Sequence, residues 1–559
     1  MSWEENSNKN TKKKLKSVLS HVAKFIFGKN IYQNFLRVYL FLVVVGSLLL
    51  YFDISHIPDT KVKYTYTYWT ALFVACSAFS NTGLTPIEIY SFYNILGQSV
   101  ILFLIWSGGI GIISVFFLLW NWLRKESEFK YKELLLLKEE RGEENLLNTF
   151  RLIKFSTIFI TLTQLFFAIL ISFWICFFPA YNQISVGVID GVEKKYMISW
   201  DDKSNLLDTY HNFPLALWHG LFCSCSAMNN AGFELFSSIN SNYSLSPFRN
   251  DWNVIFQLLV SIEIIIGGIG FPLIFDVYEK YRLKKKHMTY KFTLFTKVCL
   301  ISYIIVFIIS TGSALSFEFF YTNKSYFTNF NNTCDEWTIM NSPNEIVLDS
   351  GVVRPWGWNP EFNKVCCIIF NSINTRSAGF STVNQGLLTE GSRIIFTLSM
   401  FVGTSPSSTG GGIRTTTLAI LTCYFVATLF GKKNINLFKR RIPEETVMRS
   451  LFVFVAGIFL MLISSVIIFH TRNIYDKSMS VGETFKWHLT PIIYEICSAF
   501  GTVGLSTGVV GKCDELALFI LTILMFIGQL GVSSTLLAWR KNKNSVDTYS
   551  YGYEDIKIG

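Results

Sequence analysis

Charge is scarce in this chain. Asp, Glu, Lys and Arg make up only 16% of its 559 residues, whereas 50% are hydrophobic and the mean hydropathy is +0.37. This balance excludes a soluble protein of ordinary design. Apolar runs of roughly 20 residues, the length that crosses a bilayer, recur instead. We expect membrane spans near residues 38–52, 93–123, 155–178, 254–278, 292–319, 393–430, 451–470 and 516–539.

The sequence also lacks the usual signatures of catalysis. Its 11 cysteines form no CxxC pair, and its seven histidines are dispersed, so we expect no metal centre and no catalytic cluster. It contains no GxxxxGK[ST] phosphate loop and no Arg-rich span of the kind that senses voltage. These absences argue against a membrane enzyme, a nucleotide hydrolase and a voltage-gated channel. We expect the chain to be no enzyme and to hold no cofactor.

A signal peptide is missing as well, since residues 1–34 are polar and basic. Lys and Arg concentrate in three segments: this tail, residues 279–297 and residues 431–449. Cytoplasmic loops carry such an excess, so we expect a multi-pass protein of the cell membrane with both termini in the cytoplasm. The basic tail could bind nucleic acid, but beside a span we expect it to meet anionic membrane lipid.

What the sequence does have is one short pattern, present four times. An apolar, helix-compatible run ends in SAFSNTGL (77–84), SAMNNAGF (226–233), SINTRSAGF (372–380) and SAFGTVGLS (498–506). The aligned glycines, Gly83, Gly232, Gly379 and Gly504, are 149, 147 and 125 residues apart. A fixed element at long, similar spacing indicates an internal repeat. We expect each repeat to contain a span, a half-helix, the glycine segment and a second span.

These glycine segments carry no catalytic side chain and offer mainly backbone carbonyl oxygens. A half-helix followed by such a turn is how a backbone-lined cation filter is built. A glycine there tolerates dihedrals that a β-carbon would obstruct. The candidate filter residues are Asn81, Thr82, Gly83 and Leu84; Asn230, Ala231, Gly232 and Phe233; Ser377, Ala378, Gly379 and Phe380; and Thr502, Val503, Gly504 and Leu505.

The third repeat has an irregular second span. Residues 393–430 are too many for one crossing, and residues 403–412 contain a proline and three successive glycines, which will not hold a helix. An extramembrane loop is the alternative, but it would leave 394–402 too short to span. We therefore expect an intramembrane loop that lies below the filter as a movable barrier. Its candidate gate residues are Gly403, Ser408, Thr409, Gly410, Gly411 and Gly412.

Three charged residues fall at positions where we expect the chain to lie within the membrane. Arg376 lies three residues before Gly379, and a buried guanidinium needs a partner, for which Glu495 at matching depth is the candidate. Glu263 falls within an expected span and is a functional candidate by default, although it could also lie hydrated near the outer water layer.

On these motifs the chain resembles the Trk/Ktr/HKT superfamily of potassium transporters, most closely the bacterial TrkH and KtrB type of membrane subunit. The segments 229–233, 374–380 and 498–508 resemble its second, third and fourth filters, and SSTGGGIRTTT (407–417) resembles its intramembrane loop. The resemblance implies an all-α membrane protein of four M1-P-M2 repeats in pseudo-fourfold symmetry around one pore, with eight spans and four pore half-helices.

The resemblance also implies a function and partners. Members with glycine in all four filters favour K+, whereas serine in the first filter is associated with Na+, so K+ is the expected ion and Na+ coupling or permeation the alternative. A homodimer and cytosolic nucleotide-sensing RCK-type subunits are the expected partners. One residue departs from the pattern: relatives usually have an arginine in the last span where this chain has Gln529, so Gln529 joins the gate residues.

The expected organisation follows from these boundaries. It comprises a cytoplasmic basic tail (1–34), repeat 1 (35–123), a cytoplasmic linker (124–150), repeat 2 (151–285), repeat 3 with the gating loop (286–432), repeat 4 (433–540) and a C-terminal tail (541–559).

Overall fold

The computed structural model describes most of the apolar part of the chain. The described residues are 31–57, 66–110, 146–178, 180, 185–189, 192–196, 208–236, 245–248, 251–320, 346–348, 351–353, 359–432, 435–472 and 489–531. Most of the predicted basic tail, most of the linker and the whole C-terminal tail lie outside them. Residues 40–532 form one compact unit, and residues 1–39 with 533–559 form another, of which only the start of one helix is described.

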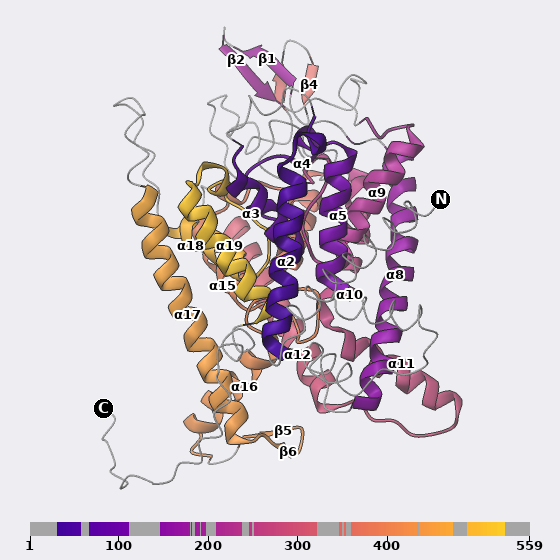
Figure 1. Cartoon of the computed structure of the whole chain (residues 1–559), viewed down its shortest axis with the longest axis vertical. Helices are drawn as coiled ribbons and strands as arrows, with labels where there is room; N and C mark the ends of the chain where they lie inside the picture. The colour runs from indigo at the N-terminus through magenta and orange to yellow at the C-terminus, as the bar shows by residue number, and fades with distance from the viewer. Residues whose placement is uncertain are drawn as a thin grey trace, which may run out of the picture. The chain divides into compact units, whose positions relative to one another are not determined.

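The described elements are mainly helices, in an order that occurs four times along the chain (Figure 1). A long helix is followed by a shorter one, by a glycine segment and by another apolar helix. The four sets are α2 (Ile31–Tyr51), α3 (Tyr68–Phe79) and α5 (Ile95–Ile110); α8 (Leu146–Phe177), α9 (Phe213–Met228) and α10 (Val254–Ile269); α12 (Leu294–Leu315), α14 (Pro360–Asn374) and α15 (Glu390–Phe401); and α17 (Glu444–Arg472), α18 (Leu489–Phe500) and α19 (Glu515–Leu530).

Smaller elements join these helices. A short helix, α4 (Ile89–Phe92), precedes α5, and α11 (Phe271–Lys285) and α16 (Thr415–Leu429) follow α10 and α15. Three antiparallel hairpins pair β1 (Ser185–Ile189) with β2 (Val192–Tyr196), β3 (Ile346–Leu348) with β4 (Gly351–Val353), and β5 (Asn436–Leu437) with β6 (Arg440–Arg441). The fold is thus helical, with strands confined to connections.

Not every expected span is a single long helix. Within the described ranges, three helices are long and apolar enough to cross a membrane: Arg151–Phe177, Leu294–Phe319 and Glu444–His470. The span expected at 254–278 is not straight, because α10 and α11 meet at Gly270 with a bend of 91°. The count of eight spans therefore stays a prediction.

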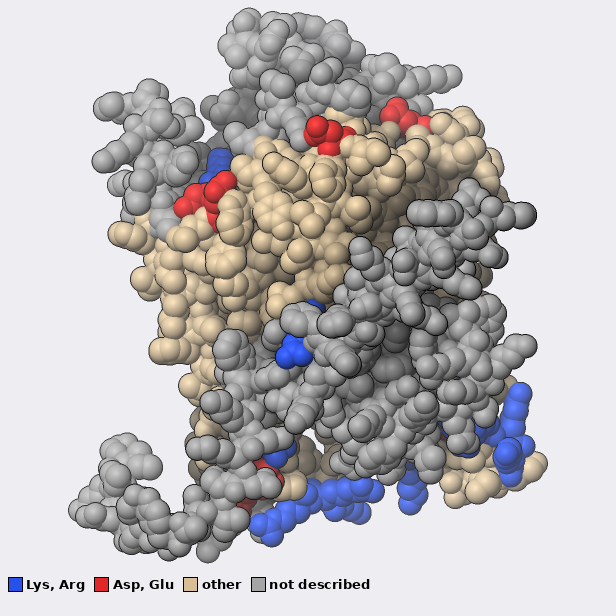
Figure 2. All heavy atoms as spheres, viewed as in Figure 1, with Lys and Arg blue, Asp and Glu red and all other residues tan. Residues whose placement is uncertain are grey.

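The long helices expose apolar side chains in a way that suits lipid. On α17, Phe459 is 63% exposed and Val466 69%, and on α12 Ile308 is 61% exposed. Apolar surface of this extent is unfavourable in water and marks a membrane or protein interface. Figure 2 shows a tan area with few charges, most of the visible basic side chains below it and most of the visible acidic ones above it.

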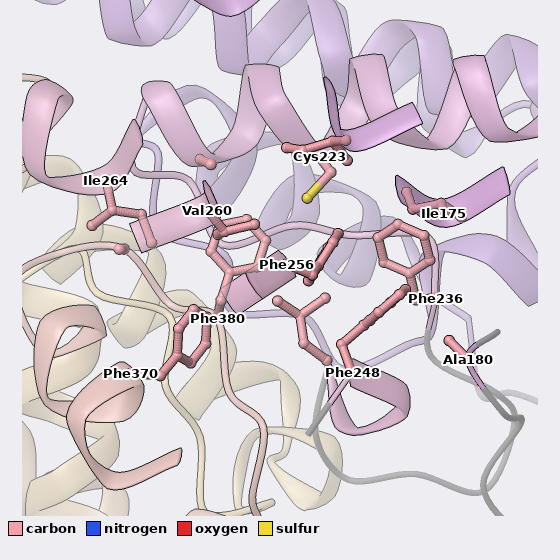
Figure 3. Packing of buried hydrophobic residues seen from close by; sticks show 14 of the residues in the cluster. Ile175, Ala180, Cys223, Phe236, Phe248, Phe256, Val260, Ile264, Phe370 and Phe380 are labelled. Atoms are coloured by element: carbon pink, nitrogen blue, oxygen red, sulfur yellow. The ribbon is translucent and has the colours of Figure 1, made fainter. Parts of the chain in front are cut away.

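Buried aromatic residues join the second and third repeats (Figure 3). Phe248 stacks on Phe256 with ring centroids 4.0 Å apart, and Phe236 meets Phe248 edge-on at 5.0 Å. Phe370 and Phe380 of the third repeat belong to the same cluster. This packing fixes helix α9 against α10 and α14, and so supports the second and third glycine segments.

Candidate ion-conduction site

Each glycine segment begins where a short helix ends. Helices α3, α9, α14 and α18 stop four or five residues before Gly83, Gly232, Gly379 and Gly504. The residue two positions before each glycine adopts a left-handed conformation, with φ of 52° at Asn81, 56° at Asn230, 66° at Ser377 and 47° at Thr502. The glycines follow with φ between 72° and 94°. The same backbone turn is therefore built four times.

Hydrogen bonds stabilise these turns. In three repeats the amide before the glycine donates to the carbonyl oxygen five residues earlier, over 2.8 Å: Thr82 to Ser77, Ala231 to Ser226, and Val503 to Ser498. In the third repeat Ala378 donates to Asn374 instead, over 3.1 Å. The third segment thus turns more tightly, although its glycine has a similar φ of 80°.

The four glycines adjoin one another in a closed order. A β-carbon built on Gly83 would lie 2.4 Å from the Ala231 carbonyl oxygen, and one on Gly232 would lie 2.8 Å from that of Ala378. One on Gly379 would lie 2.4 Å from the Val503 oxygen, and one on Gly504 would lie 2.0 Å from the Thr82 oxygen. Each glycine faces the carbonyl that precedes the next glycine, and the fourth returns to the first.

The structure therefore brings the candidate filter residues of all four repeats together. The glycines leave no room for a side chain, because a β-carbon never comes this close to an oxygen and the positive φ already disfavours L-residues. The residues after the glycines, Leu84, Phe233, Phe380 and Leu505, are each at most 2% exposed. Their side chains are thus packed inside the protein.

Small residues also hold the pore helices in place. A β-carbon on Gly108, Gly267 or Gly528 would lie 1.9, 2.2 or 2.0 Å from the carbonyl oxygen of Phe79, Met228 or Phe500, the last residues of α3, α9 and α18. The second apolar helix of repeats 1, 2 and 4 thus touches the end of its pore helix directly.

The interruption expected in the third repeat is present. Helix α15 ends at Phe401 and α16 begins at Thr415, with the glycine-rich loop between them. The Gly411 amide donates to Thr502 Oγ1 over 2.7 Å and to Ser377 Oγ over 3.2 Å. The loop therefore contacts the candidate filter residues of the third and fourth repeats.

Other contacts fix the loop from the side. The Gly412 amide donates to the Gly528 carbonyl over 3.2 Å, and Gln529 Nε2 donates to the Thr409 carbonyl over 3.2 Å. The candidate gate residue Gln529 thus lies against the loop, as the resemblance to the Trk/Ktr/HKT superfamily implies. Gly403 and Ser408 act inside the loop: a β-carbon on Gly403 would lie 1.8 Å from the Gly411 oxygen, and Ser408 Oγ donates to Thr404 Oγ1 over 2.6 Å.

One contact to the loop was not anticipated. Arg414 Nη1 donates to the Gly410 carbonyl oxygen, so a guanidinium group lies at the end of the loop. Its only signal in the sequence is a basic residue two positions after the last of the three glycines. Helix α19 offers a neutral amide to the loop at Gln529, whereas Arg414 supplies a positive charge beside the loop.

The prediction of an ion pair between Arg376 and Glu495 is wrong, because each residue has other partners. Arg376 is buried, donates from Nη1 to the Val402 carbonyl over 2.9 Å and lies over the Tyr303 ring at 5.0 Å. Glu495 Oε1 instead accepts from Ser506, from the amide and hydroxyl of Thr507, and more weakly from the Val509 amide, at 2.7 to 3.4 Å. Nearby dipoles thus take the place of the expected partner, while Nε and Nη2 of Arg376 and Oε2 of Glu495 make no hydrogen bond to the described residues.

Glu263 is also fully buried and not hydrated at a surface. Ser224 Oγ of the pore helix α9 donates to Glu263 Oε1 over 2.5 Å. Glu263 therefore ties α10 to α9, the helix that precedes the second glycine segment.

Comparison with known proteins places this architecture in a family. Residues 18–550 match the family described as TrkH, a cation transport protein. The chain is 33% identical over 582 aligned residues to an uncharacterized cation transporter of Mycoplasma pneumoniae, covering 97% of this chain and 98% of that one. It is 30% identical to the Ktr system potassium uptake protein D of Bacillus subtilis, covering 95% and 99%.

A solved structure has the same fold. The potassium transporter TrkH from Vibrio parahaemolyticus superposes with a TM-score of 0.56, covering 91% of this chain and 86% of that one at 16% identity. The chain belongs to the TrkH family of cation transport proteins and is a membrane subunit of the Trk/Ktr superfamily.

Proposed function

We propose that this chain is the pore-forming subunit of a potassium uptake system. K+ would shed its water into carbonyl oxygens of residues 81–84, 230–233, 377–380 and 502–505, and the four pore helices would direct their negative C-terminal ends toward it. The single observation that carries the proposal is the closed order of Gly83, Gly232, Gly379 and Gly504, each facing a carbonyl oxygen of the next repeat.

The identity of the ion is argued from the filters and the relatives. All four filters carry glycine, and relatives from Bacillus subtilis and Vibrio alginolyticus are named as potassium uptake proteins. A relative from Enterococcus hirae, 25% identical, is named as a potassium/sodium uptake protein. Na+ permeation or Na+-coupled transport by the same pore is therefore the second candidate.

The glycine-rich loop is the proposed gate. Its Gly411 amide bonds to Thr502 and Ser377 directly at the candidate filter, where it would obstruct a passing ion. Non-helical backbone at membrane depth is tolerated only inside protein or along a water-filled cavity, which suits a segment that moves in a pore. The membrane potential, worth about 2.3 kcal/mol per charge per 100 mV, can drive uptake when the loop moves aside.

Orientation and partners complete the proposal. The exposed basic residues of α11 and of the β5–β6 hairpin face the cytoplasm, in agreement with the positive-inside rule. The termini lie on that side. The subunit works as a homodimer with cytosolic RCK-type regulatory subunits, by its resemblance to the superfamily.

Tracer uptake tests the function. The full chain is reconstituted in liposomes loaded with K+, and the accumulation of external Rb+ is measured against added K+ or Na+. We expect Rb+ to accumulate and K+ to compete at a lower concentration than Na+. Accumulation no greater than in empty liposomes would refute the proposal, and accumulation that requires a Na+ gradient would favour the second candidate.

A further inference from the structure

A sharp turn connects the gate loop to the molecule's basic end. Helix α10 ends at Ile269, Gly270 has a φ of 100°, and α11 leaves at 91°. The Phe271 amide donates to the Ser407 carbonyl over 3.1 Å, and the Ser405 amide donates to the Gly268 carbonyl over 3.4 Å. The turn at Gly270 and the loop are therefore joined backbone to backbone.

Helix α11 lies near the end of a membrane-spanning helix. Asp276 accepts hydrogen bonds from the Thr293 amide over 3.0 Å and from Thr296 Oγ1 over 2.6 Å, in the first turn of α12. That helix begins a segment, Leu294–Phe319, that is long and apolar enough to cross the bilayer. The bonds place α11 at the level where α12 enters the apolar layer, at the lower end in Figure 1.

The outer surface of α11 is basic and aromatic. Its two acidic residues are engaged, Asp276 with α12 and Glu279 with Arg282 over 2.8 Å. Tyr281 is 60% exposed and Tyr278 39% exposed. We call the exposed side chains together the α11 surface: Tyr278, Lys280, Tyr281, Lys284, Lys285 and Lys286.

We propose that the α11 surface binds anionic phospholipid headgroups and thereby stabilises the gate loop in the position seen here. Lysines beside a bilayer are attracted to anionic lipid, and tyrosines favour the headgroup region. A helix held flat on the membrane fixes the bend at Gly270, and the bend holds Ser405 and Ser407 of the loop. The effect of bound lipid on the gate loop rests on the proposed function.

Lipid retention tests the binding. The full-length protein is purified with phosphatidylglycerol, and the lipid retained is counted by native mass spectrometry. The variant K284Q/K285Q/K286Q removes three charges from α11, and K439Q/R440Q/R441Q removes three exposed charges from the β5–β6 hairpin. At about 1 kcal/mol per basic residue, we expect the α11 variant to retain phosphatidylglycerol at least about tenfold more weakly than wild type. Equal retention, or an equal loss in both variants, would overturn the proposal.

Flux tests the regulation in the same preparations. Rb+ uptake by the wild type and the hairpin variant should fall, by about fivefold for a coupling of ordinary size, when phosphatidylglycerol is added to phosphatidylcholine liposomes. Uptake by the α11 variant should stay unchanged. An equal fall in the α11 variant would overturn the link to the gate.

The outcomes also separate this proposal from the proposed function. If no preparation carries Rb+ in any lipid, the proposed function fails and the retention measurement alone decides whether α11 binds lipid. A soluble acidic protein as the true partner would show itself as equal retention in wild type and the α11 variant.

Discussion

The Ser377 hydroxyl donates a hydrogen bond to the Thr502 carbonyl oxygen over 2.7 Å. It also lies 3.0 Å from Thr502 Oγ1, which accepts the Gly411 amide of the intramembrane loop. The third and fourth glycine segments and the loop thus share one small network of hydrogen bonds. This network couples the position of the loop to the residues that form the candidate filter.

Removing the hydroxyl of Thr502 should release the loop. Thr502→Val keeps a β-branched side chain of the same shape but removes the acceptor of the Gly411 amide. A hydrogen bond of this kind contributes about 1 kcal/mol, so the loop should leave its position more often and Rb+ uptake should rise by up to about fivefold.

The matched control for this prediction is Thr522→Val in α19. The Thr522 hydroxyl donates to the Leu518 carbonyl of its own helix over 2.8 Å. We expect unchanged uptake in this variant. Unchanged or lower uptake in Thr502→Val, with K+ still preferred over Na+, would contradict the gating role of the loop.

A positive charge at position 529 should hinder permeation. Gln529→Arg adds a guanidinium group beside the loop, and two unit charges 4 Å apart repel by about 4 kcal/mol at an effective dielectric constant of about 20. Since about 1.4 kcal/mol is tenfold, we expect Rb+ uptake to fall at least about tenfold.

A neutral variant separates the charge from the hydrogen bond. Gln529→Met keeps the length of the side chain but cannot donate to the Thr409 carbonyl oxygen. It should not reduce uptake. If Gln529→Arg leaves uptake unchanged or raises it, electrostatic repulsion does not limit flux at this place.

The bend at Gly270 should not tolerate a side chain. Gly270→Ala places a β-carbon 2.9 Å from the Pro406 carbonyl oxygen at a φ of 100° and a ψ of 139°, a region almost confined to glycine that costs an L-residue about 1–3 kcal/mol. We expect a lower Tm of the detergent-solubilised protein and altered Rb+ uptake. Gly312→Ala in α12, where a β-carbon meets no atom within 4 Å, is the control and should not lower Tm. Equal effects of the two substitutions would show that the bend is not strained by a β-carbon.

The candidate site could be predicted from the sequence more fully than the helices around it. The glycine segments and the break within residues 393–430 could be predicted, because each demands a backbone that only glycine or a broken helix supplies, whereas the gating role of the loop stays a prediction. The bend at Gly270 could not be predicted. Gly267 packs on Met228 as a small residue should, but Gly270, three residues later, turns the chain, and both look alike in the sequence.

The partner of Arg376 was unpredictable for a different reason. Sequence reasoning pairs a buried cation with an acid, whereas the structure supplies the Val402 carbonyl oxygen and the Tyr303 ring. Every residue carries a backbone carbonyl, so the sequence does not show which of them accepts a bond from Arg376. Glu495 Oε1 instead accepts from amides and hydroxyls of residues 506–509, which lie close to it in the chain.

Selectivity should depend on the first filter glycine. Gly83→Ser puts a β-carbon 2.4 Å from the Ala231 carbonyl oxygen, so the neighbouring oxygens must move apart. We expect weaker discrimination between K+ and Na+, measured as the ratio of their concentrations that halve Rb+ uptake. An unchanged ratio, at an unchanged expression level, would count against a role for Gly83 in the filter.

The most direct test of the proposed filter is to locate an ion bound in it. Anomalous diffraction from crystals of the full chain grown in Rb+ would show where a dehydrated K+ analogue binds. If the four glycine segments form the filter, an anomalous peak should lie at the centre enclosed by Gly83, Gly232, Gly379 and Gly504. The peak should be lost when Rb+ is replaced by Na+. Bound Rb+ only at other places, with that centre empty, would contradict the proposed filter.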